Sequence, residues 1–134
     1  MGYGSKGLND LRDEAYECSK AHGFYEDGPP DFGMRVALIH SELSEALEDF
    51  RDGHKPNEVW YLHNGEKTDK VSHSTEDKPN TYVPHKPCGI PSEMADVIIR
   101  VLDFCGANGI DIEGAVRQKM HYNESRPHKH GRKC

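Results

Sequence analysis

Two stretches of the chain decide the expected fold: LIHSELSEALEDF, residues 38–50, and IPSEMADVIIRVLDFC, residues 90–105. Both carry apolar residues at three- and four-residue steps, which is the pattern of an amphipathic helix. Each also carries two carboxylates three residues apart, namely Glu42 with Glu45 and Glu93 with Asp96. Because residues at this spacing share one face of a helix, each helix would present two carboxylates side by side.

The second pair stands in an apolar setting. Asp96 lies in a run that is otherwise nearly all apolar, and a carboxylate on a buried helix loses hydration worth several kcal/mol unless something replaces it. If the two helices face each other, four carboxylates share one small volume, and Mg²⁺ or Mn²⁺ suits such hard oxygen ligands. The ordinary alternative is that each pair is a solvated helix face, with Asp96 paired to Arg100 one turn along.

Composition narrows the class of protein. A chain of 134 residues suits one domain, and 34% hydrophobic with 30% charged residues suits a thin helical domain or one that oligomerises. The formal charge of −6 argues against a general nucleic-acid binder.

No apolar run approaches the roughly 20 residues that span a membrane, and the N-terminus carries no secretory signal. We therefore expect a cytoplasmic protein with reduced thiols, in which Cys18 and Cys105 act as small buried hydrophobes.

The apolar periodicity predicts an all-α fold. Helices are expected at about residues 5–21, 32–51, 91–106 and 112–123, the last with Asp111 as its N-cap. The core stripe of the second would be Val36, Ile39, Leu43, Ala46 and Phe50.

The segment between the second and third helices differs from the rest. Residues 53–89 are polar and lack helical periodicity. A small β-hairpin is expected around the turn Asn64-Gly65, followed by a flexible excursion over residues 72–85. We interpret residues 53–89 as an insertion in a single domain that spans residues 1–134.

The C-terminal region offers a candidate phosphate-binding face. Lys119 and Asn123 are four residues apart on the fourth predicted helix, and Arg126 follows one turn later. Lysine, arginine and asparagine side chains can all donate hydrogen bonds to phosphate, although a basic helix end also favours the helix dipole without any ligand. A zinc site is not expected nearby, because the spacing matches no structural zinc pattern in the set His121, His128, His130 and Cys134.

Taken together, these blocks resemble the MazG-like nucleotide pyrophosphohydrolases of the all-α NTP pyrophosphatase superfamily. The family signature is Glu-Glu-x-x-Glu on one helix and Glu-x-x-Asp on the next, and here it reads SELSE at residues 41–45 and EMAD at residues 93–96. The stretch KMHYNESRPHKHGRK, residues 119–133, is similar to the family's terminal block. Two features depart from the family: Ser41 replaces the first Glu, and the segment between the two halves is longer than usual.

The resemblance implies a bundle of four to five helices that is completed by dimerisation, as a homodimer or homotetramer. It also implies Mg²⁺-dependent hydrolysis of a nucleoside triphosphate, (d)NTP + H₂O → (d)NMP + diphosphate, in nucleotide-pool housekeeping. The alternatives are a phosphoribosyl-ATP pyrophosphatase-like enzyme of the same superfamily and a non-catalytic helical module that binds a nucleotide or a metal.

Residue roles follow from the same resemblance. The Mg²⁺ ligands would be Glu42, Glu45, Glu93 and Asp96. Of these, Glu42 or Glu45 would orient or deprotonate the attacking water. The triphosphate would contact Lys119, Asn123 and Arg126. The base would lie beside His22 and Phe24, although Phe24 reads equally well as an ordinary core residue.

Overall fold

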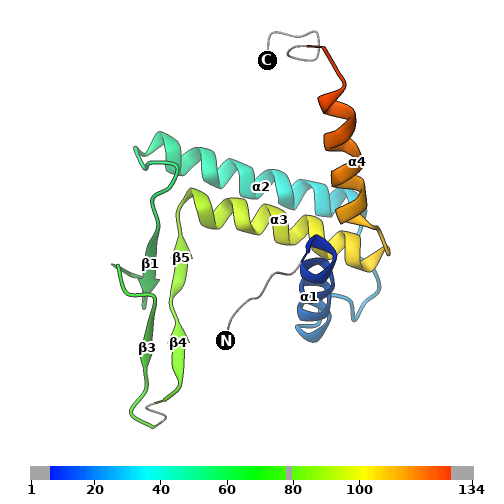
Figure 1. The fold of residues 1–134 in the computed structure, drawn as a ribbon. Coiled ribbons are helices and arrows are strands. Elements are labelled where there is room, and N and C mark those ends of the chain that lie inside the picture. Colours follow the sequence, from blue (N-terminus) through cyan, green and yellow to red (C-terminus); the bar gives the residue numbers. More distant parts are fainter. Residues whose placement is uncertain (1–6, 78–79, 128–134) are drawn as a thin grey trace. The chain divides into compact units, whose positions relative to one another are not determined.

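The structure is a computed structural model that describes residues 7–77 and 80–127. Figure 1 shows its helices, which are α1 (Leu8–Ala21), α2 (Phe32–Arg51), α3 (Ile90–Ala107) and α4 (Ile112–Glu124). Five short strands lie between α2 and α3 in the sequence: β1 (Trp60–His63), β2 (Glu66–Thr68), β3 (Ser72–Ser74), β4 (Tyr82–Pro84) and β5 (Lys86–Cys88). None of the described helices is long and apolar enough to cross a membrane.

The chain divides into two units, which are described separately. Among the described residues, the α2/β unit comprises residues 32–77 and 80–98, and the α1/α4 unit comprises residues 7–31 and 99–127. Helix α3 contributes its first half to the α2/β unit and its second half to the α1/α4 unit.

The expectation of an all-α fold is wrong, because the protein is a mixed fold of helices and small antiparallel sheets. The hairpin around Asn64-Gly65 is present, with His63 opposite Glu66. The supposed flexible excursion over residues 72–85 instead contains β3 and β4, which pair with each other. Each of these strands is three residues long, with the sequence Ser-His-Ser in β3 and Tyr-Val-Pro in β4, so neither carries an apolar alternation long enough to predict a strand.

The strands form two antiparallel ladders. One sheet has the order β2-β1-β5, with Trp60 opposite Cys88, and the other pairs β3 with β4. Pro87 lies on the edge strand β5, which is where a residue without a backbone N–H is tolerated. The pairing of β1 with β5 joins the segment that follows α2 to the segment that precedes α3.

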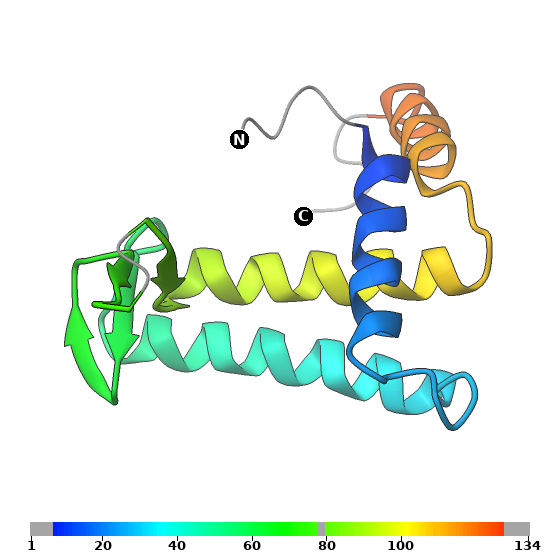
Figure 2. The ribbon, with the colours of Figure 1, turned by 90° about the horizontal axis from the view of Figure 1, so that it is seen from below.

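Helix α2 and the first half of α3 run side by side in the α2/β unit (Figures 1 and 2). The residue before α3 is Gly89, which has a φ of 111°. A Cβ atom at this position would lie 2.4 Å from the carbonyl oxygen of Glu58, so only glycine allows the chain to pass here and enter α3. Glu58 is itself held by His54, whose Nδ1 lies 2.8 Å from its Oε2.

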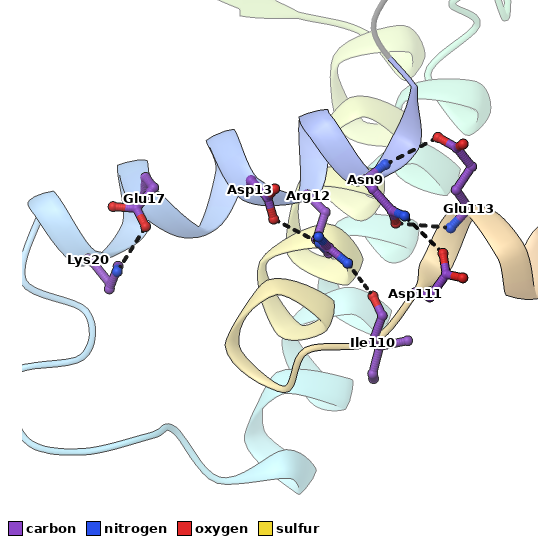
Figure 3. A network of polar contacts seen from close by, with 8 residues as sticks. All are labelled: Asn9, Arg12, Asp13, Glu17, Lys20, Ile110, Asp111 and Glu113. Carbon is purple, nitrogen blue, oxygen red and sulfur yellow. Dashed lines mark hydrogen bonds and ion pairs between the residues drawn. The ribbon is translucent and has the colours of Figure 1, made fainter.

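Polar contacts connect α1 to the start of α4 in the α1/α4 unit (Figure 3). The Asn9 side chain donates to Asp111 over 2.8 Å and accepts from the backbone N–H of Glu113 over 3.2 Å. Arg12 donates to the carbonyl oxygen of Ile110 over 2.8 Å. Asp111 also accepts from the backbone N–H of Gly114, and it is therefore the N-cap of α4, as the sequence predicts.

Apolar burial is limited, and three residues form the buried hydrophobic core of the described chain: Ala46, Leu102 and Cys105. In the predicted stripe of α2, Leu43 and Phe50 are exposed instead. Cys18 is also exposed, so the expectation that it is buried is wrong, whereas the one for Cys105 is confirmed.

Close packing of α1 against the second half of α3 depends on Gly106. A Cβ atom there would lie 2.5 Å from the Cβ of Tyr16 and 3.1 Å from the carbonyl oxygen of Arg12. We expect Gly106→Ala to lower the free energy of unfolding, because overpacking costs about 1–3 kcal/mol while the gain in helix propensity returns about 1 kcal/mol. Urea unfolding measures the change, and Ala95→Ser, at an exposed position of α3, should change the value by about 0.5 kcal/mol or less. A stabilised Gly106→Ala protein would contradict this packing.

Candidate functional site

Three carboxylates converge between α2 and the first turn of α3. Glu42 and Glu45 lie one turn apart on α2, and Glu93 lies on the first turn of α3. One oxygen from each of the three lies within 4.8 Å of the others. We call Glu42, Glu45 and Glu93 the carboxylate cluster, and it lies wholly within the α2/β unit.

The three members differ in their exposure. Glu42 is almost fully buried, with 9% of its surface exposed. Glu93 is half-buried, and its Oε2 is a buried atom without a hydrogen-bond partner. Glu45 is exposed. An unsatisfied buried acceptor is costly and uncommon in folded proteins, so an added partner for this Glu93 oxygen would be favourable.

The electrostatics of the cluster lead to the same conclusion. Burial, followed by close contacts with the carboxylates of Glu45 and Glu42, raises the pKa of Glu93 from 4.5 to about 8. Like charges at this separation favour a proton on one member. A divalent cation bound here would replace that proton, because it neutralises the same negative charge.

The donor set fits Mg²⁺ or Mn²⁺. Carboxylate oxygens are hard ligands, which suit these ions, and the buried oxygen of Glu93 lacks a partner that a cation would supply. Mg²⁺ prefers six ligands and usually keeps some positions for water and phosphate oxygens. Glu42, Glu45 and Glu93 would hold the ion and leave the remaining positions for other ligands.

The fourth predicted ligand is placed differently. Asp96 is exposed, and it does not belong to the carboxylate cluster found in the described part of the chain. It follows Glu93 by three residues on α3, where the helix turns by about 300°, and its side chain is shorter than that of glutamate. Glu93 and Asp96 therefore do not both reach the cluster, although they have the same three-residue spacing as Glu42 and Glu45.

The predicted phosphate-binding residues lie at the end of α4, in the α1/α4 unit. The Lys119 ammonium is 5.3 Å from the centre of the Tyr122 ring, and the Arg126 guanidinium carbon is 5.7 Å from the same centre. The backbone N–H of Arg126 donates to the carbonyl oxygen of Asn123. Lys119 and Tyr122 line an open hollow of about 330 Å³ together with Ala115 and Gln118.

The residues predicted to lie beside the base follow α1. His22 is the C-cap of α1, and its Nδ1 lies 2.8 Å from the carbonyl oxygen of Cys18. Phe24 is 68% exposed, so the alternative that Phe24 is an ordinary core residue is wrong. An exposed aromatic ring remains available for stacking.

Three further potential ligands were missed by the sequence analysis. His63, His73 and His85 come together in the strand-bearing segment. The one signal in the sequence was the abundance of histidine between residues 53 and 89. Their spacings of 10 and 12 residues match no metal-binding motif, and only the strand pairing makes them neighbours.

Comparisons of this chain with models of protein families, with curated proteins and with solved structures find no match.

The raised pKa of Glu93 predicts how stability depends on pH in metal-free protein. Between pH 4.5 and about 8 the folded state keeps a proton that the unfolded state has lost, so the contribution of Glu93 to stability decreases as pH rises. We expect Glu93→Gln to remove this decrease and to be more stable than the unmodified protein at pH 8. Urea unfolding in the presence of a chelator measures it, with Glu66→Gln, at an exposed position of β2, as the control. Identical pH profiles for all three proteins would contradict the buried placement of Glu93.

Proposed function

We propose that this protein is a Mg²⁺-dependent nucleoside triphosphate pyrophosphohydrolase that converts (d)NTP and water to (d)NMP and diphosphate. The convergence of Glu42, Glu45 and Glu93 carries the proposal. The resemblance of their sequence blocks to the MazG-like family supplies the reaction class. Mn²⁺ is the expected substitute for Mg²⁺, and a role in cleansing the nucleotide pool follows from the same reaction.

The bound metal would neutralise phosphate oxygens and make a water molecule more acidic. The remaining roles, cation binding and orientation of the attacking water, are assigned to residues of the cluster. Glu42 is buried and half-buried Glu93 has a raised pKa, so both suit the holding of the cation. Glu45 is exposed, so water can reach it, and we assign to it the orientation or deprotonation of the attacking water.

The end of α4 is the proposed phosphate-binding element. Lys119 and Arg126 place two positive charges near the ring of Tyr122. A lysine ammonium is a point charge for phosphate, and an arginine guanidinium can bind two phosphate oxygens at once. These two residues would stabilise the charge that develops on the departing diphosphate, with Asn123 as an additional donor.

The activity of two α3 variants tests the proposal. We expect Glu93→Gln to lower kcat for diphosphate release by about 100-fold or more, because it removes a metal ligand. Asp96→Asn should cost about 10–100-fold, the range typical of residues that act on a metal from outside its ligand set. The measurement is release of NMP and diphosphate from a panel of canonical and modified (d)NTPs with Mg²⁺.

The matched control is Glu48→Gln, which removes an exposed carboxylate of α2 that lies 3.7 Å from Arg51. It should retain full activity. Unchanged turnover in Glu93→Gln would refute the assignment. If calorimetry shows binding of Mg²⁺ and a non-hydrolysable nucleotide but the protein hydrolyses none of the (d)NTPs, the protein is a non-catalytic binding module instead.

We propose in addition that the active species is a homodimer or a dimer of such dimers. The described chain contains no fully buried large side chain. Helix α2 exposes several large apolar residues, of which four share one face at about 100° per residue: Phe32, Leu43, Leu47 and Phe50. A second copy of this chain is the occupant we assign to this face. Covering one leucine side chain contributes roughly 1.5–3 kcal/mol, so several such residues together offset much of the entropic cost of association.

Light scattering tests the assembly. We expect Leu47→Glu to weaken association by about tenfold or more, because it places a charge where roughly 1.5–3 kcal/mol of apolar burial is expected. Met120→Glu is the control, since Met120 is similarly exposed but lies on α4, and it should leave the mass unchanged. A monomeric unmodified protein would rule out the second copy.

A further inference from the structure

Strand pairing places three histidines in one small volume of the α2/β unit. His63 is the last residue of β1, His73 is the middle residue of β3, and His85 lies between β4 and β5. The backbone around them is fixed by hydrogen bonds. His73 is opposite Val83 in the β3–β4 ladder, and the backbone N–H of His85 donates to the carbonyl oxygen of Val71 over 2.9 Å.

The imidazole rings are in mutual contact. The centre of the His63 ring lies 4.4 Å from the centre of the His73 ring and 4.4 Å from that of His85. One ring nitrogen from each histidine lies within 4.8 Å of the others, and the His73 Nδ1 and His85 Nε2 are 2.9 Å apart. Tetrahedral coordination with Zn–N bonds of about 2.0–2.1 Å requires nitrogens separated by roughly 3.3 Å. The His73–His85 nitrogen distance of 2.9 Å is slightly shorter than this value, and the other nitrogen pairs are separated by 4.8 Å or less.

The surroundings of His85 fix its ligating atom. His85 is 6% exposed, and its Nδ1 lies 2.7 Å from the carbonyl oxygen of Lys70. Because a carbonyl oxygen can only accept, Nδ1 carries the hydrogen and Nε2 keeps its lone pair. A backbone carbonyl that accepts from the second ring nitrogen is the usual support of a metal-bound histidine.

Imidazole binds metals in its neutral form. In the absence of metal, Nδ1–H of His73 can donate to Nε2 of His85 across their 2.9 Å contact. Binding of a cation would require His73 to move this hydrogen to its other ring nitrogen, so that both lone pairs face the metal.

We propose that His63, His73 and His85 bind one Zn²⁺ ion, with the fourth position open to water or to an added ligand. Imidazole nitrogen is a ligand that zinc prefers, whereas Mg²⁺ prefers oxygen. The ion would connect β1, β3 and the β4–β5 junction, which are otherwise joined by ladders of three residue pairs. This site is separate in its chemistry from the carboxylate cluster, and it does not depend on the proposed hydrolase activity.

Zinc binding by the full chain tests this proposal. After removal of metals with a chelator, we expect one tightly bound Zn²⁺ per chain at this site, and Co²⁺ in its place should give the visible absorption of a tetrahedral nitrogen-ligated ion. His63→Gln and His73→Gln should each weaken Zn²⁺ binding by about 100-fold or more, beyond the 10–100-fold typical of supporting residues. Calorimetry measures the affinity and absorption spectroscopy measures the coordination.

Two controls separate this site from other ligands. His40→Gln removes an exposed histidine of α2, and Glu93→Gln disables the carboxylate cluster; both should bind Zn²⁺ and give the Co²⁺ spectrum as the unmodified protein does. X-ray absorption of the zinc-loaded unmodified protein should report three imidazole ligands, and this measurement does not require any variant to fold. Oxygen-dominated coordination would overturn the proposal. So would unchanged zinc affinity in both histidine variants, since the rings would then only pack against one another.

Discussion

The like charge of the carboxylate cluster is the constraint on which the α2/β unit depends. Three carboxylates within 4.8 Å of one another repel, and burial removes the water that would weaken that repulsion. The fold must therefore supply either a proton or a cation. The raised pKa of Glu93 and its unpartnered oxygen are two consequences of the same requirement. A protein that gained nothing from this arrangement would be more stable with an amide at one of the three positions.

The strand-bearing segment explains how the cluster is held together. Strand β1 pairs with β5, and Gly89 passes so close to the carbonyl oxygen of Glu58 that a Cβ atom would not fit. These contacts tie the connection after α2 to the entry of α3. The first turn of α3, and Glu93 with it, is thereby placed opposite Glu42 and Glu45. Residues 53–89, which the sequence analysis interprets as an insertion, thus fix the position of the first turn of α3 along α2.

The sequence predicted what local rules determine. Helices α2 and α4, the Asp111 cap and the Asn64-Gly65 turn follow from periodicity, capping and turn chemistry, and the structure contains all of them. Of the four acids that the two helix patterns single out, Glu42, Glu45 and Glu93 lie together, whereas Asp96 is exposed and lies outside the carboxylate cluster. The sequence analysis did not predict the strand pairings between residues far apart in the chain. The pairing of β1 with β5 joins residues more than twenty positions apart, and strands of three or four residues are too short to carry a periodic signal that identifies their partners.

The same unit brings together two ligand sets that select different metals. The carboxylate cluster offers oxygen, which favours ions that keep water and accept phosphate, whereas the histidines offer nitrogen, which favours zinc. A cation at the histidines would bind β1 to the β4–β5 junction, and β1 and β5 are the strands whose pairing positions Glu93. The two sites are thus linked through one short ladder.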